Sequence, residues 1–359
     1  MKNFKSLCKF WKNKKVFVTG HTGFKGSWFS LMLTLLGAKV SGYSLRPNDE
    51  FNLFDLLQLK KKIHSSIIGD IREYDKLKKS IQKTSPDFVV HMAAQPLVSE
   101  SYNNPRYTYE VNTLGTVNIL NILKELNFIK SALIITTDKV YLNNNKKKYF
   151  KENDRLGGSD PYSNSKACTE LVVDSFNRSF FKKNKIFVAT ARAGNVIGGG
   201  DFSKNRIVPD FFRSLSNDQK LKLRSPNSIR PWQHVIEPLN GYLILLMKLY
   251  KKQIVSGSCF NFGPNSSSNK PVSKIINLLN NNFDNSVKVM KQKKFTKKFN
   301  ESKVLMLSSS KSKKILNWKV KYDLKKSIEL TSDWYVPFIK KKHKDILKIS
   351  LEQIRNYYN

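Results

Sequence analysis

The chain is poor in cysteine, with only Cys8, Cys168 and Cys259 among 359 residues. Their positions show no metal-ligand spacing and offer too few thiols for a disulfide framework. The sequence therefore predicts no zinc or other metal site, and it excludes a disulfide-stabilised secreted module. Sparse cysteine is typical of proteins in a reducing compartment, so we expect a cytoplasmic location.

The chain also lacks long hydrophobic runs. Residues 1–15 carry many lysines and no apolar segment of the kind that a secretory signal needs. The most apolar later run, residues 242–247, is far too short to cross a bilayer. We expect no membrane partner, and the hydrophobic content of 40% suits a globular protein.

Acidic residues are scarce: 27 Asp and Glu stand against 64 Lys and Arg, which gives a net charge of +37. Such an excess could indicate binding to nucleic acid or to an anionic membrane. The lysines are spread along the whole chain, however, and no basic run is interleaved with aromatic residues that could stack on bases. We interpret the charge as a feature of a Lys- and Asn-rich composition and predict no nucleic-acid partner.

Strand-like and helix-like patterns alternate through residues 12–190. Apolar runs at 16–19, 39–44, 67–68, 88–92, 132–136 and 186–191 are separated by helical patterns at 27–36, 74–82, 108–126 and 161–181. This alternation predicts an α/β protein with a Rossmann-type, doubly wound parallel sheet. Right-handed crossovers would bring the carboxyl ends of the strands to one edge, where ligands bind.

The regular alternation fades after residue 191, where glycines and prolines break the chain into short elements. We predict a dinucleotide-binding domain over 12–190 and a smaller, mixed substrate-binding domain over 191–337. A strand near 257–263 is expected to return to the main sheet. The basic tail, 338–359, has apolar residues at helical spacing and predicts a docked terminal helix.

The most informative motif is Gly20-x-x-Gly23-x-x-Gly26, which lies between a strand-like and a helix-like run. Glycines in such a turn let the backbone approach a pyrophosphate, while the free N–H groups and the dipole of the helix face the anion. The glycines alone also fit an ordinary strand–helix turn. The flanking patterns favour a dinucleotide site, lined by Gly20, Thr22, Gly23, Phe24 and Gly26.

Two further motifs carry possible chemistry. Tyr162 and Lys166 are four residues apart and share one face of a predicted helix, which we expect Asp160 to cap with Pro161 at its first position. A lysine one turn from a tyrosine is expected to lower the pKa of the phenol. A predicted strand is followed directly by Thr137, Asp138 and Lys139, so all three would lie at the ligand-binding edge of the sheet. The simpler alternative is a surface Asp–Lys pair.

With Ala93-Ala94, these motifs resemble the extended short-chain dehydrogenase/reductase family, in its nucleotide-sugar class. Longer strings at 21–28, 91–98, 137–139, 160–163, 191–201 and 230–235 resemble the CDP-glucose 4,6-dehydratases of that family. The likeness runs from about residue 10 to residue 335 and fades beyond 338. Val140 stands where we expect a cysteine in these enzymes.

The resemblance implies a lyase that holds NAD and converts CDP-glucose to CDP-4-dehydro-6-deoxyglucose, a precursor of deoxysugars in surface polysaccharide. It assigns Tyr162, supported by Lys166, as the base at the sugar 4-hydroxyl, and Thr137 as a hydrogen-bond partner of the 4-oxygen. Asp138 becomes the acid at the departing 6-hydroxyl and Lys139 the base at C5, which requires a neutral amine. Alternatively, Lys139 only orients Asp138 or water.

The resemblance also implies binding residues and a homo-oligomer, as a homodimer or homotetramer. Ala93 and Ala94 are expected at the cofactor, and Asp70 and Ile71 at its adenine, although a simple strand-end turn would explain that pair as well. The second strand ends without the acidic residue that usually grips the NAD ribose, and Arg46 would even suit a 2′-phosphate. Substrate-binding candidates are Gln95, Arg192, Asn195, Arg206, Arg230 and His234, each of which could instead be structural.

Three functions remain open on these grounds. The first is the CDP-glucose dehydratase. The second is a 4-epimerase or a dehydratase for another nucleotide sugar, although an epimerase would not need Asp138 and Lys139 together. The third is an inactive scaffold of the same fold or a basic nucleic-acid binder, which would not need Tyr162 and Lys166.

Overall fold

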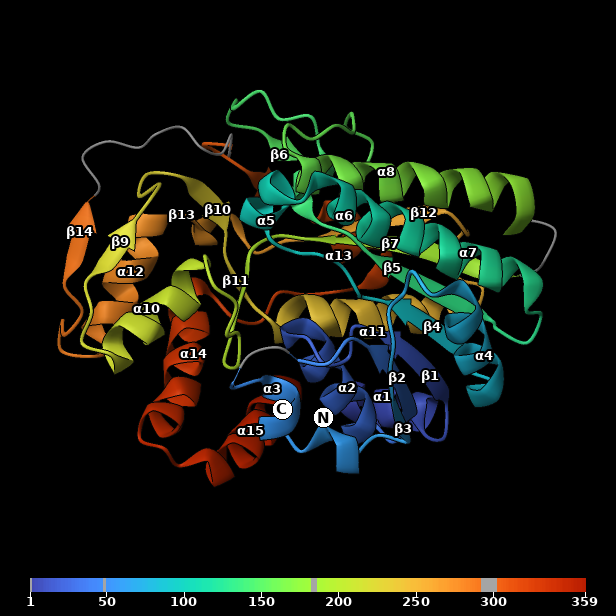
Figure 1. Cartoon of the computed structure of the whole chain (residues 1–359), viewed down its shortest axis with the longest axis horizontal. Helices are drawn as coiled ribbons and strands as arrows, with labels where there is room; N and C mark the ends of the chain where they lie inside the picture. The colour runs from blue at the N-terminus through green and yellow to red at the C-terminus, as the bar shows by residue number, and fades with distance from the viewer. Residues whose placement is uncertain (1, 48–49, 182–185, 292–301) are drawn as a thin grey trace.

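The computed structural model describes residues 2–47, 50–181, 186–291 and 302–359, and it is built around a seven-stranded parallel sheet (Figure 1). The strands are β1 (Lys15–Thr19), β2 (Lys39–Ser44), β3 (Ser65–Ile68), β4 (Phe88–His91), β5 (Ser131–Ile135), β7 (Phe187–Ala193) and β12 (Ser258–Phe262). Their order is β12-β7-β5-β4-β1-β2-β3. The chain thus winds outward from β1 in both directions, which confirms the doubly wound α/β fold.

Successive side chains of each strand supply two different cores, because they point to opposite faces of the sheet. Val16 and Val18 pack against α1 (Lys2–Trp11), α2 (Phe24–Leu35) and α11 (Ile236–Tyr250). Phe17, between them, belongs to the core under α4 (Tyr74–Thr84), α7 (Gly115–Glu125) and α8 (Pro161–Phe176). Helices therefore cover both faces and leave the carboxyl edge of the sheet for ligands.

Two predicted helices are interrupted. The pattern at 108–126 is divided among α6 (Pro105–Tyr109), a π turn, η2 (Glu110–Leu114), and α7. The pattern at 161–181 is α8 followed by a second π turn, η4 (Asn177–Phe181). Short helices α3 (Leu53–Leu56), η1 (Leu59–Lys61) and α5 (Val98–Asn103) fill connections around the sheet edge.

The second half of the chain forms a smaller, mixed region beside the sheet (Figure 1). Its strand pairs are β8 (Val196–Ile197) with β11 (Gln233–His234), β10 (Ile229–Pro231) with β13 (Asn269–Pro271), β9 (Leu221–Leu223) with β14 (Val289–Lys291), and β15 (Met306–Leu307) with β6 (Tyr149–Phe150). Its helices are α10 (Ile207–Ser216), η5 (Ser266–Ser268), α12 (Val272–Asn281), α13 (Ser310–Leu316) and α14 (Leu324–Ile339). Between these elements the chain returns once to the main sheet, through α11 and β12.

The C-terminal tail forms η6 (His343–Asp345) and α15 (Ile346–Tyr358), which docks on α14 and α11. The Trp334 indole N–H donates to Ser350 Oγ at 2.9 Å, and the Tyr357 hydroxyl donates to Glu237 Oε2 at 3.0 Å. Tyr357 and Tyr358 are buried. Among the helices of the described ranges, none is long and apolar enough to cross a membrane.

Glu237, at the start of α11, makes the stability of the folded protein depend on pH. Burial raises the pKa of its carboxyl from 4.5 to about 7, although Tyr322 N–H, the Tyr357 hydroxyl and Lys321 oppose the shift. The folded protein therefore holds this proton more tightly than the unfolded chain, so stability falls as the pH rises from about 5 to about 8. A shift of this size corresponds to about 3 kcal/mol.

We predict that Glu237→Gln flattens this dependence, because the amide is neutral and its oxygen can still accept from the N–H groups of Lys321 and Tyr322, as Glu237 Oε1 does. Thermal melts of both proteins across the pH range measure the effect. An unchanged slope in the variant would show that Glu237 does not hold the proton.

Candidate active site

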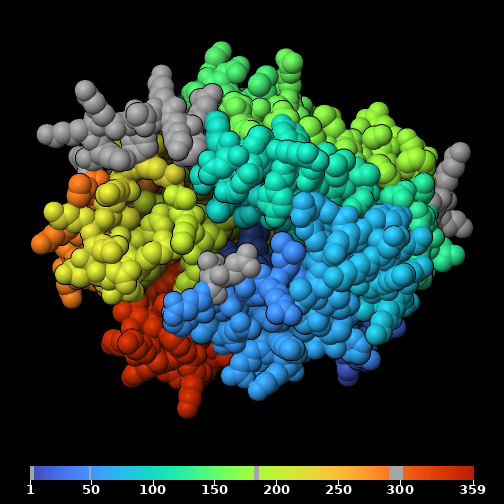
Figure 2. Space-filling model, viewed as in Figure 1, coloured from blue at the N-terminus to red at the C-terminus, as the bar shows by residue number. Residues whose placement is uncertain are grey.

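A cavity of about 570 Å³ lies between the carboxyl edge of the sheet and the smaller region. Its walls come from the glycine turn after β1, from the segments that follow β2 to β5, and from residues 193–210 and 222–232. Figure 2 shows the surface hollowed at this place, between the sheet residues and the yellow residues of the second half. The cavity joins the predicted cofactor motif to the predicted chemical groups.

The glycine turn is closed to side chains at two positions and open at the third. Gly20 has φ +76°, and a Cβ there would lie 2.7 Å from Ala93 N, while a Cβ on Gly26 would overlap the carbonyl oxygen of Gly20. A Cβ on Gly23 would meet only the Gly20 carbonyl, at 3.5 Å, although Gly23 borders the cavity. Helix α2 starts here without a side-chain cap, so its first N–H groups are available to an anion.

Every predicted cofactor residue lines this cavity: Gly20, Thr22, Gly23, Phe24, Gly26, Asp70, Ile71, Ala93, Ala94, Tyr162 and Lys166. Near the end of β2, Thr22 Oγ1 and Ser44 Oγ are 2.8 Å apart, and Arg46 also borders the space. The Asp70 carboxylate is already bound by Arg72, whose Nη2 lies 2.7 Å from Oδ2. The donors, the glycine cradle and the shape of this end fit a dinucleotide.

Thr137, Asp138 and Lys139 leave the end of β5 through the short turn η3 (Asp138–Val140). The Thr137 hydroxyl donates to Asp138 Oδ1 at 3.1 Å. Asp138 Oδ2 is buried and has no hydrogen-bond partner within the described part of the chain. Burial raises the pKa of Asp138 to about 6, against the charges of Lys139 and Arg230. About a tenth of this carboxyl is therefore protonated at neutral pH.

Tyr162 and Lys166 lie on the first turns of α8, which begins as predicted. Asp160 caps the helix by accepting from the Ser163 N–H at 2.9 Å, and Pro161 occupies the first position. Lys166 Nζ donates to the Ile135 carbonyl at 3.2 Å, and burial lowers its pKa to about 8. This bond fixes α8 against the end of β5.

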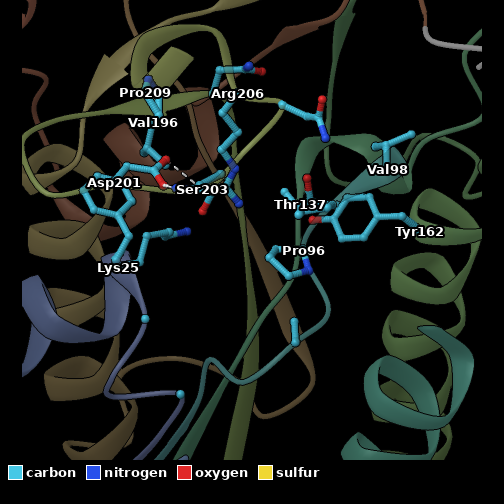
Figure 3. A pocket seen from close by; sticks show the side chains of 18 of the residues that line it. Lys25, Pro96, Val98, Thr137, Tyr162, Val196, Asp201, Ser203, Arg206 and Pro209 are labelled. Atoms are coloured by element: carbon cyan, nitrogen blue, oxygen red, sulfur yellow. Dashed lines mark hydrogen bonds and ion pairs between the residues drawn. The ribbon is translucent and has the colours of Figure 1, made fainter. Parts of the chain in front are cut away.

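The expectation that Lys166 lowers the pKa of Tyr162 is wrong for this structure. Burial raises the pKa of Tyr162 to about 12, although a hydrogen bond with Thr137 and the charge of Arg206 both favour the phenolate. The reason is partly geometric, because Lys166 Nζ donates to the strand carbonyl of Ile135. Figure 3 shows Thr137 and Tyr162 pointing toward one another on one side of the cavity.

The opposite wall holds a cation that sequence reasoning missed. Lys25 extends from the glycine turn, and its Nζ donates to the Tyr242 hydroxyl at 3.2 Å. Burial, together with the charges of Lys166 and Arg206, lowers the pKa of Lys25 to about 7, against the effect of Asp138. In Figure 3 it lies beside Asp201 and Arg206. The only signal in the sequence was its place between Gly23 and Gly26.

Three of the six substrate-binding candidates line the cavity: Asn195, Arg206 and Arg230. Arg206 Nη1 lies 2.9 Å from Asp201 Oδ2, so a carboxylate already orients this guanidinium. Two further cations, Lys222 and Arg224, border the same end, and no motif in the sequence had singled them out. Together these groups form a basic wall suited to phosphates.

The other three candidates, Gln95, Arg192 and His234, do not line the cavity, and each is buried within the protein. Arg192 Nε and Nη2 each donate to the buried Glu170 carboxylate, with two bonds of 2.8 Å. Gln95 turns inward, where its amide donates to Thr108 Oγ1 at 2.9 Å. His234 is fully buried behind Gly198. None of the three borders the cavity in the described part of the chain.

No group of three or more His, Cys, Asp or Glu side chains in the described ranges is placed to hold a metal ion. The reactive groups that do meet in the cavity are hydroxyls, a carboxyl and amines. Thr137, Asp138, Lys139, Tyr162 and Lys166 surround one end of the same cavity that the glycine turn borders. This arrangement suits proton transfer beside a bound dinucleotide.

Comparison with known proteins agrees with this site. The family model described as GDP-mannose 4,6 dehydratase matches residues 17–331. The CDP-glucose 4,6-dehydratase of Salmonella typhimurium is 41% identical over 353 residues, which cover 97% of either chain.

Solved structures share the fold. One is an epimerase of Methanothermobacter thermautotrophicus, with a TM-score of 0.79, 22% identity and coverage of 94% of this chain and 97% of that one. Another is a dTDP-glucose 4,6-dehydratase of Bacillus anthracis in complex with NAD, with a TM-score of 0.75, 20% identity and coverage of 94% and 99%. The match over nearly the whole chain, together with the cavity just described, shows that this protein belongs to the GDP-mannose 4,6 dehydratase family of nucleotide-sugar enzymes.

Proposed function

We propose that the protein converts CDP-glucose to CDP-4-dehydro-6-deoxyglucose and water, for the biosynthesis of a deoxysugar of surface polysaccharide. The observation that carries the proposal is that Thr137, Asp138, Lys139 and Tyr162 line one cavity together with the glycine turn. The choice of nucleotide rests on the 41% identical relative from Salmonella. No added reductant is consumed, because oxidation at C4 and reduction at C6 balance.

The proposed cofactor is NAD, held by the backbone of Gly20 to Gly26, by Ala93 and Ala94, and by Tyr162 and Lys166. When bound, it supplies reversible two-electron oxidation of the sugar alcohol. Asp70 and Ile71 border the proposed adenine end, and Arg46, which also lines the cavity, would suit the 2′-phosphate of NADP as an alternative. The free N–H groups of α2 would bind the pyrophosphate.

Tyr162 and Thr137 act at the sugar 4-hydroxyl in this proposal. The phenolate of Tyr162 accepts the hydroxyl proton, and the Thr137 hydroxyl, which has one proton, turns from Asp138 Oδ1 to donate to the 4-oxygen. Since burial disfavours the phenolate, the hydrogen bond with Thr137 and the charge of Arg206 have to offset part of that penalty. The ketone that results at C4 acidifies the proton on C5.

Asp138 and Lys139 carry out the elimination. Asp138 donates its proton to the departing 6-hydroxyl, a role that its raised pKa and unpaired Oδ2 support. Lys139 removes the C5 proton or, as the alternative, orients Asp138 and water. Arg206, Arg230 and Asn195 would hold the diphosphate, with Lys222 and Arg224 beside them.

A panel of nucleotide sugars tests the function. Incubation with CDP-glucose, without added reductant, should give a product lighter by one water, detected by mass spectrometry. Loss of water from dTDP-glucose or GDP-mannose alone would keep the chemistry and overturn the nucleotide. A product of unchanged mass that chromatography separates from the substrate would identify a 4-epimerase instead.

The glycine cradle gives a prediction about the cofactor. Gly23→Val should lower the affinity for NAD by at least about tenfold, because the new side chain enters the space that the pyrophosphate needs. Gly23 has φ −76°, an ordinary value for any residue, so the melting temperature should change little. Calorimetric titration with NAD measures the effect. Wild-type affinity in the variant would place the dinucleotide elsewhere.

We also propose a homo-oligomer in the cytoplasm, with neither nucleic acid nor membrane as a partner. Leu114 in η2 and Leu171 in α8 are 55% and 58% exposed, and these two elements pack against each other. Apolar side chains on adjacent helices suit a contact between two copies.

The three free cysteines favour a reducing compartment. Light scattering of the purified protein measures the oligomeric state, and a monomer would contradict this part.

A further inference from the structure

The buried ion pair between Glu170, on α8, and Arg192, on β7, has more hydrogen-bond partners than a link between a helix and a strand requires. Arg192 Nε and Nη2 each donate to a different oxygen of the Glu170 carboxylate, at 2.8 Å. The side chains of both residues are 4% exposed. A well-packed apolar pair would often be as stable at such a place, so the charges call for another explanation.

The pair is hydrogen-bonded to both ends of the segment that carries Thr137, Asp138 and Lys139. At the start of the segment, Thr136 Oγ1 donates to Glu170 Oε1 at 2.5 Å. At its end, Arg192 Nη1 donates to the Tyr141 hydroxyl at 2.9 Å, and that hydroxyl donates to Asn261 Oδ1 at 2.7 Å. The four residues between them, 137–140, are therefore held at both ends by residues that bind the same ion pair.

The same pair belongs to the helix that carries Tyr162 and Lys166. Glu170 lies one turn beyond Lys166 and two turns beyond Tyr162 on α8, so the three share a face. Lys166 Nζ adds a bond to the Ile135 carbonyl at the end of β5. Thr190, on β7, donates to Glu170 Oε2 at 2.7 Å. One carboxylate thus ties β5, β7 and α8 together beneath the cavity.

We propose that Glu170 and Arg192 are positioning residues, which hold the Thr137–Lys139 segment at the distance and orientation from Tyr162 that the elimination requires. This inference rests on the proposed function. Neither residue borders the cavity, so they act through the residues that they bind, of which Thr136 and Tyr141 flank the segment itself. Small displacements of reacting groups can lower a rate about 10²-fold, which makes such a device measurable.

The test removes one hydroxyl at each end of the segment, in Thr136→Val and Tyr141→Phe, and leaves the ion pair in place. We expect kcat for dehydration of CDP-glucose to fall at least about tenfold in each variant, with KM changed less than about twofold. The oxidation at C4, in which Tyr162 accepts the hydroxyl proton, should suffer less than the elimination. The 4-keto sugar that still carries its 6-hydroxyl, trapped by quenching with borodeuteride, should therefore rise several-fold relative to the 6-deoxy product.

Tyr357→Phe is the matched control, since it also removes a buried hydroxyl that is bonded to a glutamate, but far along the chain from residues 136–141. It should lose stability without changing kcat or the ratio of trapped species. If Thr136→Val and Tyr141→Phe lose stability but, like the control, keep the wild-type kcat and ratio of trapped species, the positioning role is overturned. If the wild-type protein forms no 6-deoxy product at all, the proposed function falls, and this role in it falls as well.

Arg192→Lys separates positioning from charge. Lysine keeps the positive charge beside Glu170 but cannot make two parallel bonds to the carboxylate and a third to Tyr141. We expect the same rise in the trapped 4-keto sugar as in Tyr141→Phe. If Arg192→Lys folds and gives the wild-type ratio of trapped 4-keto sugar to 6-deoxy product, the inference is contradicted.

Discussion

An Asp138→Asn variant is expected to oxidise the sugar but to release no water from it, with dehydration lowered about 10³-fold. The asparagine amide would still accept the bond from Thr137 and fill the same volume, but it has no acidic proton to give to the departing hydroxyl. Burial holds a fraction of the Asp138 carboxyl in its acid form, and Oδ2 has no protein partner among the described residues. The loss should therefore fall on elimination.

Mass spectrometry after a borodeuteride quench measures this result, because it separates the 4-keto sugar with an intact 6-hydroxyl from the 6-deoxy product. Asp174→Asn is a suitable control, since Asp174 lies farther along α8 in an exposed ion pair with Arg178. Dehydration by Asp138→Asn within about tenfold of the wild type would remove Asp138 from the role of acid.

The second large effect is expected from Tyr162→Phe, which should lose oxidation and dehydration together by about 10³- to 10⁴-fold. Without the hydroxyl, nothing at this position accepts the proton of the sugar 4-hydroxyl. Lys166 remains bonded to Ile135 and the glycine turn is untouched, so binding of NAD should lose no more than the contribution of the single Tyr162 hydroxyl. Neither the 4-keto sugar nor the 6-deoxy product should accumulate, in contrast with Asp138→Asn.

Initial rates with CDP-glucose and a parallel titration with NAD measure both parts of this prediction. The ring of the phenylalanine keeps the packing of α8, which a thermal melt would verify. A variant that still forms the trapped 4-keto sugar at a wild-type rate would assign the first proton transfer to another group.

The fold and the tightly packed glycine turn could be predicted because local patterns determine them. Strand-like runs such as 16–19 and 132–136 occupy the sheet as predicted, since each is long enough to cross a buried core. The start of α8 follows from Asp160 and Pro161, which are local signals. Gly20 and Gly26 are required by contacts within a few residues and with Ala93.

The features that sequence reasoning missed depend on contacts between distant residues. Arg192 lies in a string typical of the family, yet its partner Glu170 is 22 residues away, and only the fold brings the two together. Lys25 enters the cavity wall because Tyr242, on α11, lies beside the glycine turn. The pKa of Tyr162 depends on burial, which outweighs any effect of the lysine four residues along. The π turn η2 likewise has no clear signal in its residues.

The measurement that tests the central claim most directly follows the hydrogen on C4. CDP-glucose carrying deuterium at C4 is incubated with the protein, and the product is examined by nuclear magnetic resonance. An internal redox cycle predicts that the deuterium appears on C6 of a 6-deoxy-4-keto sugar, without consumption of added NAD. Deuterium retained at C4 of a sugar that still carries its 6-hydroxyl would contradict the dehydratase and identify an epimerase or an inactive protein.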